Sequence, residues 1–444
     1  MTEILIRGGT IVTIDPAWRV LAGDVAIRDG VIVQLGGSYT PIDRDYEILE
    51  AAGCVVMPGL VQSHVHTCQS LARGRADDLE LLDWLQKVVW PYEASLGEAD
   101  VAAAARLACA ELLLGGTTAI LDMGTVHHTD AIFEAARDAG LRATIGKAMM
   151  DADDEVIPPG LREATATSLA ESARLCSRWH GAEGDRLRYA YAPRFALSCT
   201  DDLLRAVARE ASARGVRIHT HASENQDEIA LVKRRTGKDN VYYLHDVGLT
   251  GSHVALAHCV WLSDRERGLL AETGTHVVHC PSSNLKLGSG IAAVPDLLDA
   301  GVAVSLGCDG APCNNTMDGF LEMRLAALLH KPRYGGAALP APMVVRMATL
   351  GGAAALGLAD RTGSLELGKR GDVIVVDLGG PHVVPTEDPY SAIVYACRST
   401  DVQHVVVDGE LVVRDQALTR LDLPAVLRDA RAAARGVFDR MGRG

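Results

Sequence analysis

The sequence lacks several features that would assign it to common classes of protein. Its ten cysteines are scattered along 444 residues without a CxxC pair, so no compact disulfide framework is indicated. We therefore expect most of them to be buried free thiols in a cytoplasmic protein. Neither GxGxxG nor a Walker motif occurs, which argues against a doubly wound open sheet that would bring a glycine-rich phosphate loop early.

The sequence also lacks clusters of basic residues, and it does not start with a long apolar run. The formal net charge is −14 at pH 7, whereas a surface for nucleic acid or anionic membrane would need grouped lysine and arginine. The first residues, MTEILIRGGTIVTID, carry Glu3 and are interrupted early by Arg7, so they resemble neither a secretory signal nor a membrane span. We expect a cytoplasmic protein, and small neutral or cationic substrates are compatible with its charge.

The composition allows a large core with a smaller partner domain, because 48% of the residues are hydrophobic. Residues 3–56 alternate apolar and polar positions around glycine-containing turns, which predicts short antiparallel strands. The pattern returns in RGDVIVVDLGG and VQHVVVDGELVVRDQ, so we expect both chain ends to form one small β-sandwich domain. The predicted domains are 1–56 and 363–420 for the sandwich, 57–362 for the central domain and 421–444 for a terminal helix.

Between the ends, short apolar runs alternate with longer amphipathic helical patterns, which is typical of β/α units with a parallel sheet. Eight such runs favour an α/β fold of the (β/α)8 TIM barrel type. The runs are VVMPGLVQSHVH, TTAILDMGT, RATIGKAMM, RLRYAYAPR, VRIHTHASE, VALAHCV, THVVHCPSS and VAVSLGCDG. Polar residues fall at the C-terminal tips of these runs, where barrel enzymes keep their active sites.

Two histidines close the first run, in GLVQSHVHTCQ. A strand turns alternate side chains to opposite faces, so His64 and His66 point the same way, as two ligands of one metal ion would. The fifth run ends in HTHASE with His219 and His221 on one face, and the spacing alone does not choose between them. His221 lies nearer the strand tip and is the preferred candidate, which leaves His219 as a residue of the barrel interior.

Further candidates stand at the tips of the fifth, sixth and eighth runs, namely Glu224, His258 and Asp309. Each of these residues alone is compatible with a core or surface role, whereas their joint placement on several strand tips is typical of a functional site. Three imidazoles and one carboxylate suit one divalent ion such as zinc with an open position for water, and iron or manganese fits the same donors.

The motifs PGLVQSHVH, HASE, LAHCVWL, HCPSSNLKLGSG and LGCDGAPCNN resemble those of the amidohydrolase superfamily, in its branch of deaminases and chlorohydrolases that act on aminopurine and s-triazine rings. The resemblance covers nearly the whole chain, including GSLELGKRGDVIVVDL near its end. It implies one metal ion held by His64, His66, His221 and Asp309. It also implies that Glu224 and His258 lie beside the attacking water, with Glu224 and Asp309 as its proton carriers. The fourth run, RLRYAYAPR, offers no lysine for a carbamylated bridge, which favours one metal over two.

The same resemblance gives two sets of candidate substrate contacts. Glu93 matches a glutamate that binds ribose hydroxyls in the S-adenosylhomocysteine and methylthioadenosine deaminases, although guanine deaminases carry a glutamate at a similar place. Gln69 and Arg194 resemble the guanine-deaminase pattern, in which the arginine would bond a ring carbonyl. Adenosine-type deaminases usually have a histidine where Arg194 stands.

Four more residues are candidates near the mouth of the barrel. Lys147, on the third run, falls where those deaminases often have an arginine, so it is either a substrate contact or a rim charge. Trp84, Trp90 and Trp261 have flat rings that can stack on a substrate, with packing as the alternative role. Trp90 is counted among the substrate contacts.

The sequence therefore predicts a metal-dependent hydrolytic deaminase that releases ammonia from an aminopurine. Because the motif set resembles that group, 5′-substituted adenosines are the first expectation: 5′-deoxyadenosine, methylthioadenosine and S-adenosylhomocysteine. Guanine is second, and an s-triazine or pterin is third. A non-catalytic scaffold on the same barrel is the alternative of another class, and the full set of metal ligands argues against it. The family commonly forms dimers or tetramers, so we expect a homodimer or homotetramer without a nucleic-acid or membrane partner.

Overall fold

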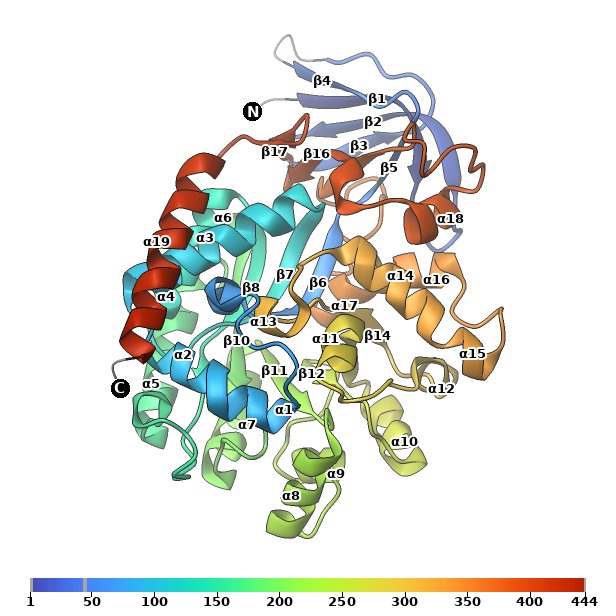
Figure 1. Ribbon diagram of the computed structural model, residues 1–444. Helices are drawn as coiled ribbons and strands as arrows, with labels where there is room; N and C mark the ends of the chain where they lie inside the picture. The colour runs from blue at the N-terminus through green and yellow to red at the C-terminus, as the bar shows by residue number, and fades with distance from the viewer. Residues whose placement is uncertain (1–2, 43–45, 443–444) are drawn as a thin grey trace.

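The computed structural model describes residues 3–42 and 46–442, which form a barrel and a sheet domain against one end of it (Figure 1). The barrel strands are parallel and hydrogen-bonded in chain order, with β9 beside β10. Their bounds are β6 (Leu60–Val65), β7 (Thr117–Met123), β8 (Arg142–Gly146), β9 (Ala148–Met149), β10 (Leu187–Pro193), β11 (Arg217–Ala222), β12 (Val254–His258), β13 (His276–His279) and β14 (Val304–Leu306). A parallel bridge between Val65 and Asp309 joins the last strand region to the first. The predicted (β/α)8 TIM barrel is confirmed.

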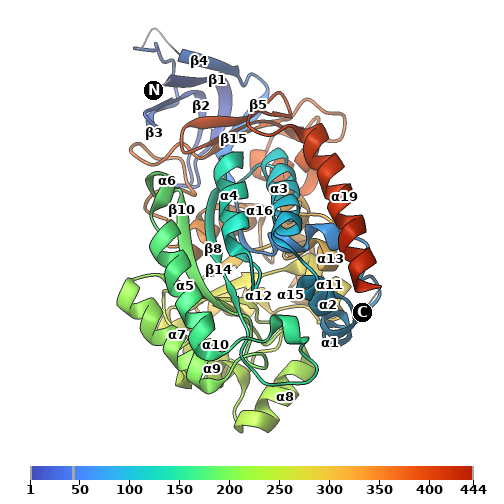
Figure 2. The ribbon, with the colours of Figure 1, turned by 90° about the vertical axis from the view of Figure 1, so that its left-hand side faces the viewer.

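Helices connect the barrel strands and cover their outer side, and Figure 2 shows α4, α3 and α19 lying alongside one another. The longer helices are α3 (Glu98–Leu114), α4 (Thr129–Ala139), α5 (Thr165–Trp179), α7 (Asp201–Arg214), α8 (Gln226–Thr236), α9 (Asn240–Asp246), α10 (Asp264–Thr273), α14 (Gly319–Leu329) and α19 (Leu423–Met441). The short helical segments are η1 (Thr67–Ala72), α1 (Leu81–Trp84), η2 (Leu85–Val89), α2 (Trp90–Ala94), η3 (Pro159–Leu161), α6 (Ala182–Asp185), α11 (Pro281–Lys286), α12 (Val294–Asp299), α13 (Ala311–Asn314), α15 (Lys331–Tyr334), α16 (Ala341–Arg346), η4 (Met347–Gly351), α17 (Gly352–Ala355), α18 (Pro389–Ser391), η5 (Ala392–Ala396) and η6 (Ser399–Asp401).

Local sequence signals explain where these helices begin and end. Before α10, the Ser263 hydroxyl accepts the Glu266 amide, and the Glu266 carboxylate accepts the Ser263 amide at 2.9 Å, which satisfies two N–H groups at the helix start. The Thr200 hydroxyl accepts an amide in the same way before α7. That helix ends at Gly215, whose φ of 65° is left-handed and favours glycine.

Side chains of the barrel strands alternate between the interior and the surrounding helices. One cluster of small and branched residues fills the interior, and it contains Val61, Ala119, Leu121, Ala190, Ala255 and Val278. Ala353 and Leu356, at α17, belong to the same cluster and close the barrel where the strands begin. Ile120 and Ile145 point the other way and pack in the main core with the helices. The apolar runs of the sequence are therefore continuous because both faces of each strand are buried.

The chain ends form a separate sheet ordered β18, β17, β16, β15, β5, β1, β2 and β3, with β4 beside β1. The strands are β1 (Glu3–Val12), β2 (Val20–Arg28), β3 (Val31–Leu35), β4 (Tyr46–Glu50), β5 (Cys54–Pro58), β15 (Val373–Asp377), β16 (Val402–Val407), β17 (Glu410–Arg414) and β18 (Ala417–Leu418). The sheet domain is confirmed, but β1 pairs in parallel with β4 and β5, so the prediction of antiparallel strands throughout 3–56 is wrong there. Parallel pairing needs a long crossover, and the β2–β3 hairpin with its following loop provides it.

The first predicted run of the barrel, VVMPGLVQSHVH, is divided between the two bodies. Its first half lies in β5 of the sheet domain, where Met57 pairs with Ile374, and its second half is β6 of the barrel. The chain passes between the bodies at Gly59, where an added Cβ would lie 2.1 Å from side-chain atoms of Thr118. Only glycine fits at such a distance. Strand β5 therefore crosses the predicted boundary between residues 56 and 57.

Two expectations from the sequence concern the cysteines and membrane-spanning segments. All ten cysteines are free and buried, as expected for packed thiols. Among the residues that the structure describes, no helix combines the length and apolar character that a bilayer crossing requires.

A buried ion-pair network joins the barrel to the sheet domain. Arg142 begins β8, and only 1% of its side chain is exposed. Its Nε donates to Asp372 Oδ2 at 2.6 Å, and its Nη2 donates to Asp408 Oδ1 at 2.7 Å. Burial alone would lower the pKa of Arg142, but the charges of the two aspartates raise it overall. Both carboxylates belong to the sheet domain, so this guanidinium ties the two bodies together.

We expect Arg142→Met to lower the free energy of unfolding by about 3–5 kcal/mol, because the buried carboxylate of Asp372 loses its cation, whereas Asp408 keeps its pair with Arg370. Urea denaturation followed by circular dichroism measures the change. Arg137→Met is the matched control, since Arg137 pairs with Asp138 on the surface with side chains 40% and 44% exposed, and it should cost less than about 1 kcal/mol. Equal losses in the two variants would contradict a special role for the buried network.

Candidate active site

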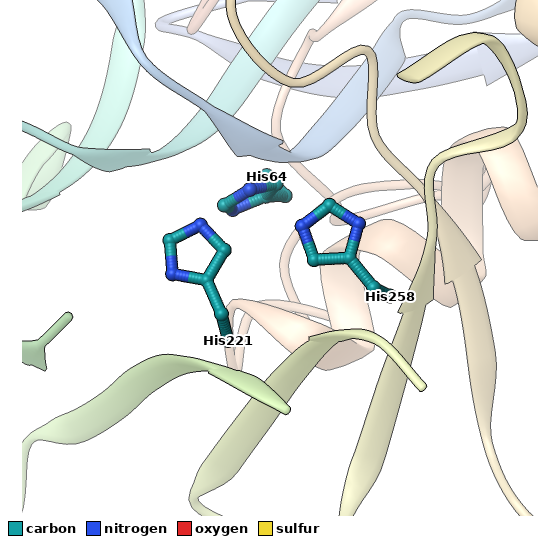
Figure 3. A group of neighbouring side chains, drawn as sticks. All are labelled: His64, His221 and His258. Atoms are coloured by element: carbon teal, nitrogen blue, oxygen red, sulfur yellow. The ribbon is translucent and has the colours of Figure 1, made fainter. Parts of the chain in front are cut away.

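The carboxyl ends of the barrel strands bring together the polar side chains that the sequence places at the strand tips. His64 lies in β6 with His66 directly after it, His221 lies in β11, His258 ends β12, and Asp309 follows β14. Figure 3 shows His64, His221 and His258 converging from three strands. The five residues are buried, except that His221 is half-buried.

Two groups of these side chains have the spacing of a metal site. The ligand atoms of His64, His66 and Asp309 all lie within 4.8 Å of one another, and so do those of His64, His221 and His258. His64 Nε2 lies 3.2 Å from Asp309 Oδ1, and His66 Nε2 lies 3.5 Å from the same oxygen. His66 Nε2 is 3.2 Å from His221 Nε2, so the two groups adjoin and surround a common centre.

Backbone carbonyls fix the orientation of two of these imidazoles. Nδ1 of His66 donates to the Met123 carbonyl at 2.8 Å, and Nδ1 of His221 donates to the Arg194 carbonyl at 2.6 Å. Since a carbonyl oxygen only accepts, the proton of each neutral ring stays on Nδ1 and Nε2 carries a lone pair. Ligating histidines in metal sites are held by the same kind of second hydrogen bond.

The Nε2 lone pairs of His66 and His221 consequently face each other across 3.2 Å. Protonation does not relieve this contact, because burial lowers the pKa of His66 to about 3 and that of His221 well below its ordinary value. Two acceptors this close repel each other unless a cation is present. The donor set of imidazole nitrogens and one carboxylate oxygen therefore fits a divalent ion such as zinc.

His219 stands behind His64 and does not belong to either group. Its Nε2 lies 2.8 Å from His64 Nδ1, so its ring bonds the side of His64 that faces away from the centre. The structure thus brings His221, rather than His219, into the groups that could hold an ion. Sequence reasoning left His219 as an interior residue and did not foresee that it orients His64.

Glu224 lies beside the same centre. Its Oε2 is 3.5 Å from His258 Nε2, and the Ser289 hydroxyl is 3.5 Å from its Oε1. Burial raises the pKa of Glu224 well above its ordinary value, and the charges of Asp309 and Glu228 raise it further. A raised pKa favours the protonated carboxyl, which is the form that can donate a proton.

A second buried carboxylate holds the turn that carries Glu224. Glu228 Oε2 accepts the Glu224 amide at 2.8 Å, and Glu228 Oε1 accepts Asn240 Nδ2 at 2.7 Å. Glu228 lies in the first turn of α8, so it ties the end of β11 to α9. Glu228 was not among the candidates predicted from the sequence; its place in the first turn of a helix, close after Glu224, was the available signal.

Several residues at the strand ends have left-handed backbones although they are not glycine. The φ angles are 52° at Ser223, 74° at His258 and 61° at Asp309. Such conformations cost about 1–3 kcal/mol each and persist where the surroundings over-determine them. The Ser283 hydroxyl, which donates to Asp309 Oδ2 at 2.7 Å, is one such restraint. Ser283 and Ser289 lie in the motif HCPSSNLKLGSG, which could have pointed to them.

Three candidate substrate residues contact one another. Arg194 Nη1 donates to Glu93 Oε2 at 2.5 Å, and Arg194 Nη2 donates to Glu93 Oε1 at 3.1 Å. Gln69 Nε2 donates to Glu93 Oε1 at 2.8 Å. All three side chains are buried, and Arg194 lines the cavity of the site. The pairing joins residues far apart in the sequence and was not anticipated.

Among the candidates near the mouth, Trp84 lines this cavity, whereas Lys147, Trp90 and Trp261 do not. Lys147 is completely buried, with its ammonium bonded to Glu163 and to the Ala148 carbonyl, so it is not a charge on the rim. Trp90 is buried in an apolar cluster with Leu161, which is a packing position. Trp261 is 43% exposed, and its Nε1 donates to the Ser289 carbonyl.

The cavity itself has a volume of only about 30 Å³. A cavity needs roughly 10–15 Å³ of such space to hold one water molecule, so this one admits water but no ring system. Apolar side chains of Leu81, Trp84 and Leu85 line it beside the polar groups. A bicyclic ring therefore enters only if the segment that carries these three residues moves.

Replacing His219 with leucine should weaken zinc affinity about 10-fold to 100-fold, because Nδ1 of His64 loses the partner that orients it. Competition with a chelating dye measures the affinity. His279→Leu is the matched control, since His279 is equally buried on β13 and neither ring nitrogen has a hydrogen-bond partner within the described part of the chain. Unchanged affinity in the His219 variant would show that this contact is dispensable.

Known proteins are similar to this chain in sequence and in architecture. The protein-family model described as "Amidohydrolase family" matches residues 55–412 of this chain. A 5-methylthioadenosine/S-adenosylhomocysteine deaminase of Syntrophobacter fumaroxidans is 41% identical and aligns with 98% of this chain and 98% of its own length. A 5′-deoxyadenosine deaminase of Methanosarcina mazei is 40% identical, over 99% of this chain and 100% of its own.

A solved structure extends the comparison to three dimensions. The crystal structure of an adenosine deaminase from Xanthomonas campestris with bound zinc has a TM-score of 0.92 and 32% identity, covering 99% of both chains. The resemblance inferred from the strand-tip motifs is therefore confirmed. The chain belongs to the amidohydrolase family.

Proposed function

We propose that this protein is a metal-dependent hydrolytic deaminase, a hydrolase of non-peptide C–N bonds that releases ammonia from an aminopurine. Its substrate is a 5′-substituted adenosine: 5′-deoxyadenosine, methylthioadenosine or S-adenosylhomocysteine. The names of the two curated relatives support this substrate class. The observation that carries the proposal is the pair of facing neutral imidazoles, His66 and His221, with Glu224 beside them.

In this proposal His64, His66, His221 and Asp309 hold one divalent ion, which is zinc, with iron or manganese as alternatives. When bound, the ion acts as a Lewis acid that lowers the pKa of water toward neutrality. His258 bonds Asn284 Oδ1 through Nδ1 at 2.9 Å, so its Nε2 is oriented toward the same centre and would polarise the attacking water or stabilise the developing charge.

Two carboxylates move the protons. Glu224 passes a proton from the water to the ring nitrogen beside the reacting carbon, which lets the ring accept electrons as its aromaticity is lost. The raised pKa of Glu224 suits this transfer. Asp309 receives the second proton and delivers it to the amine, the C–N bond breaks, and ammonia leaves. The Ser283 hydroxyl keeps Oδ2 of Asp309 in position for that step.

Glu224→Gln should retain its metal and lose about 10²-fold to 10⁴-fold in kcat, because an amide cannot shuttle the proton. Ammonia release and elemental analysis of the purified variant measure the two properties. Asp227→Asn removes an exposed carboxylate three residues away on the same turn and should leave both unchanged. Full activity in Glu224→Gln would refute its role as proton carrier.

Glu228→Ala should lower kcat about 10-fold to 100-fold with little change in KM or metal content, because the turn carrying Glu224 loses its anchor. Glu266→Ala removes a similarly buried carboxylate that caps α10 by accepting the amides of Ser263 and Val241, and within the described part of the chain it bonds none of the candidate site residues. That control should lose stability without losing kcat. A matching loss of kcat in both variants would mean that Glu228 acts only through stability.

Guanine is the second candidate substrate, and the Glu93–Arg194 contact favours it. Both oxygens of Glu93 already accept hydrogen bonds from Arg194 or Gln69, which leaves less capacity for ribose hydroxyls. The guanidinium has five N–H donors and uses two of its nitrogens here, so it retains donors for a ring carbonyl.

An ammonia-release assay over 5′-deoxyadenosine, methylthioadenosine, guanine, a pterin and an s-triazine separates these candidates. We expect kcat/KM for the 5′-substituted adenosines to exceed that for guanine by at least about tenfold, the scale on which buried polar contacts discriminate. A higher value for guanine selects the second candidate. Release from none of the compounds contradicts the proposed function.

We also propose the cellular setting and assembly. Ten buried free thiols support a cytoplasmic location, where cysteines stay reduced. A homodimer or homotetramer is the proposed assembly, as is common in the family. The proposed domains are a sandwich from 1–56 and 363–420, a barrel from 57–362 and a helix from 421–444.

A further inference from the structure

A second cavity lies at the opposite end of the barrel, where the strands begin. Its volume is about 260 Å³, and its lining includes Thr144, His180, Arg188, Arg217 and Gly357. Arg217 and Arg188 stand at the starts of β11 and β10. The residues proposed for deamination follow the other ends of the strands, so this cavity is separate from the candidate active site.

Arg217 is a cation for which the described residues provide no carboxylate partner. Its Nη2 donates to the Ser252 carbonyl at 2.8 Å, whereas its Nε is buried and has no hydrogen-bond partner there. Burial, followed by the charge of Arg188, lowers the pKa of Arg217 to about 10, so the guanidinium is still charged at neutral pH. A charge shielded from water is costly unless an opposite charge compensates it.

The neighbouring groups leave a surplus of positive charge. Arg188 and Arg361 both pair with the single carboxylate of Asp185. Burial and the charge of Arg217 together lower the pKa of His276 to about 4, so this ring stays neutral beside the cation. The surplus is notable in a chain whose formal net charge is −14. It marks this end of the barrel as one at which an anion would be attracted.

Two uncharged donors also line the cavity. The Oγ1 atom of Thr144 is buried and has no hydrogen-bond partner among the described residues. Nδ1 of His180 accepts the Tyr189 amide at 3.3 Å, so the neutral ring carries its proton on Nε2, where it can donate. At Gly357 an added Cβ would lie 2.8 Å from Arg217 Nη1, so glycine leaves space beside the guanidinium.

We propose that this cavity binds a small inorganic oxyanion, phosphate or sulfate. The fork of N–H groups on a guanidinium matches the oxygens of such an ion, and the threonine and histidine donors complete the contacts. Pockets for organic ligands usually measure about 300–1,000 Å³, so the smaller volume here suits the inorganic ion rather than a nucleotide. The ion neutralises Arg217 and links the starts of β8, β10 and β11. Its role is to stabilise the barrel, independently of the proposed deaminase activity.

Isothermal titration of the metal-loaded protein with sodium phosphate, and separately with sodium sulfate, tests the proposal at constant ionic strength. We expect saturable binding and a rise in the melting temperature that follows occupancy. Arg217→Gln keeps a donor for the Ser252 carbonyl but removes the charge, and it should weaken oxyanion binding about tenfold or more. Thr144→Val, which keeps the shape of the side chain, should weaken binding to a smaller extent.

Arg205→Gln is the control, because Arg205 also donates to a backbone carbonyl, that of Asp246 at 2.7 Å. It should bind oxyanions like the unmodified protein. An anion bound at the metal centre would be unaffected by all three substitutions. Binding that is absent, or that is the same in Arg217→Gln, Thr144→Val and the unmodified protein, would overturn the proposal and leave water as the occupant of the cavity. A response to phosphate alone or sulfate alone would identify which ion is preferred.

Discussion

Two imidazole lone pairs that face each other across 3.2 Å are the constraint on which the rest of the site depends. The carbonyls of Met123 and Arg194 keep the protons of His66 and His221 on Nδ1, and burial prevents a second protonation. The arrangement is favourable only when a cation binds both nitrogens. The proposed reaction depends on a cation bound by these two nitrogens, because an ion held there would activate water beside Glu224.

The residues proposed for the reaction and the residues proposed to stabilise the fold lie at opposite ends of the barrel strands. Left-handed residues such as His258 and Asp309 stand at the carboxyl ends, where backbone strain is retained by hydrogen bonds around the site. At the amino ends, the network around Arg142 joins the barrel to the sheet domain, and Arg217 borders the second cavity. Mutations at the two ends are therefore expected to have different signatures, in turnover at one end and in unfolding at the other.

Much of the fold could be predicted from the sequence because both faces of the barrel strands are buried and leave continuous apolar runs. His64, His66, His221, His258 and Asp309 were found because each stands at the tip of such a run. The division of the first run at Gly59 could not be predicted, since it depends on contact with Thr118 in another strand.

Side-chain partners were the part that sequence reasoning missed. Nothing in the local sequence shows that Arg194 bonds Glu93, or that Lys147 is neutralised by Glu163, because each pair is brought together by the fold. Pairing changes what such a residue offers to a substrate, so the candidate substrate contacts were less predictable than the candidate metal ligands. The candidate metal ligands could be predicted because the carboxyl ends of parallel strands lie at the same end of a barrel, and each ligand stands at such an end.

X-ray absorption spectroscopy of the zinc-loaded protein tests the central claim most directly. The account predicts one equivalent of zinc with nitrogen and oxygen neighbours at about 2.0–2.2 Å and no sulfur shell. A sulfur neighbour at about 2.3 Å would place the ion on one of the ten cysteines instead, and failure to retain zinc would remove the cation that His66 and His221 require.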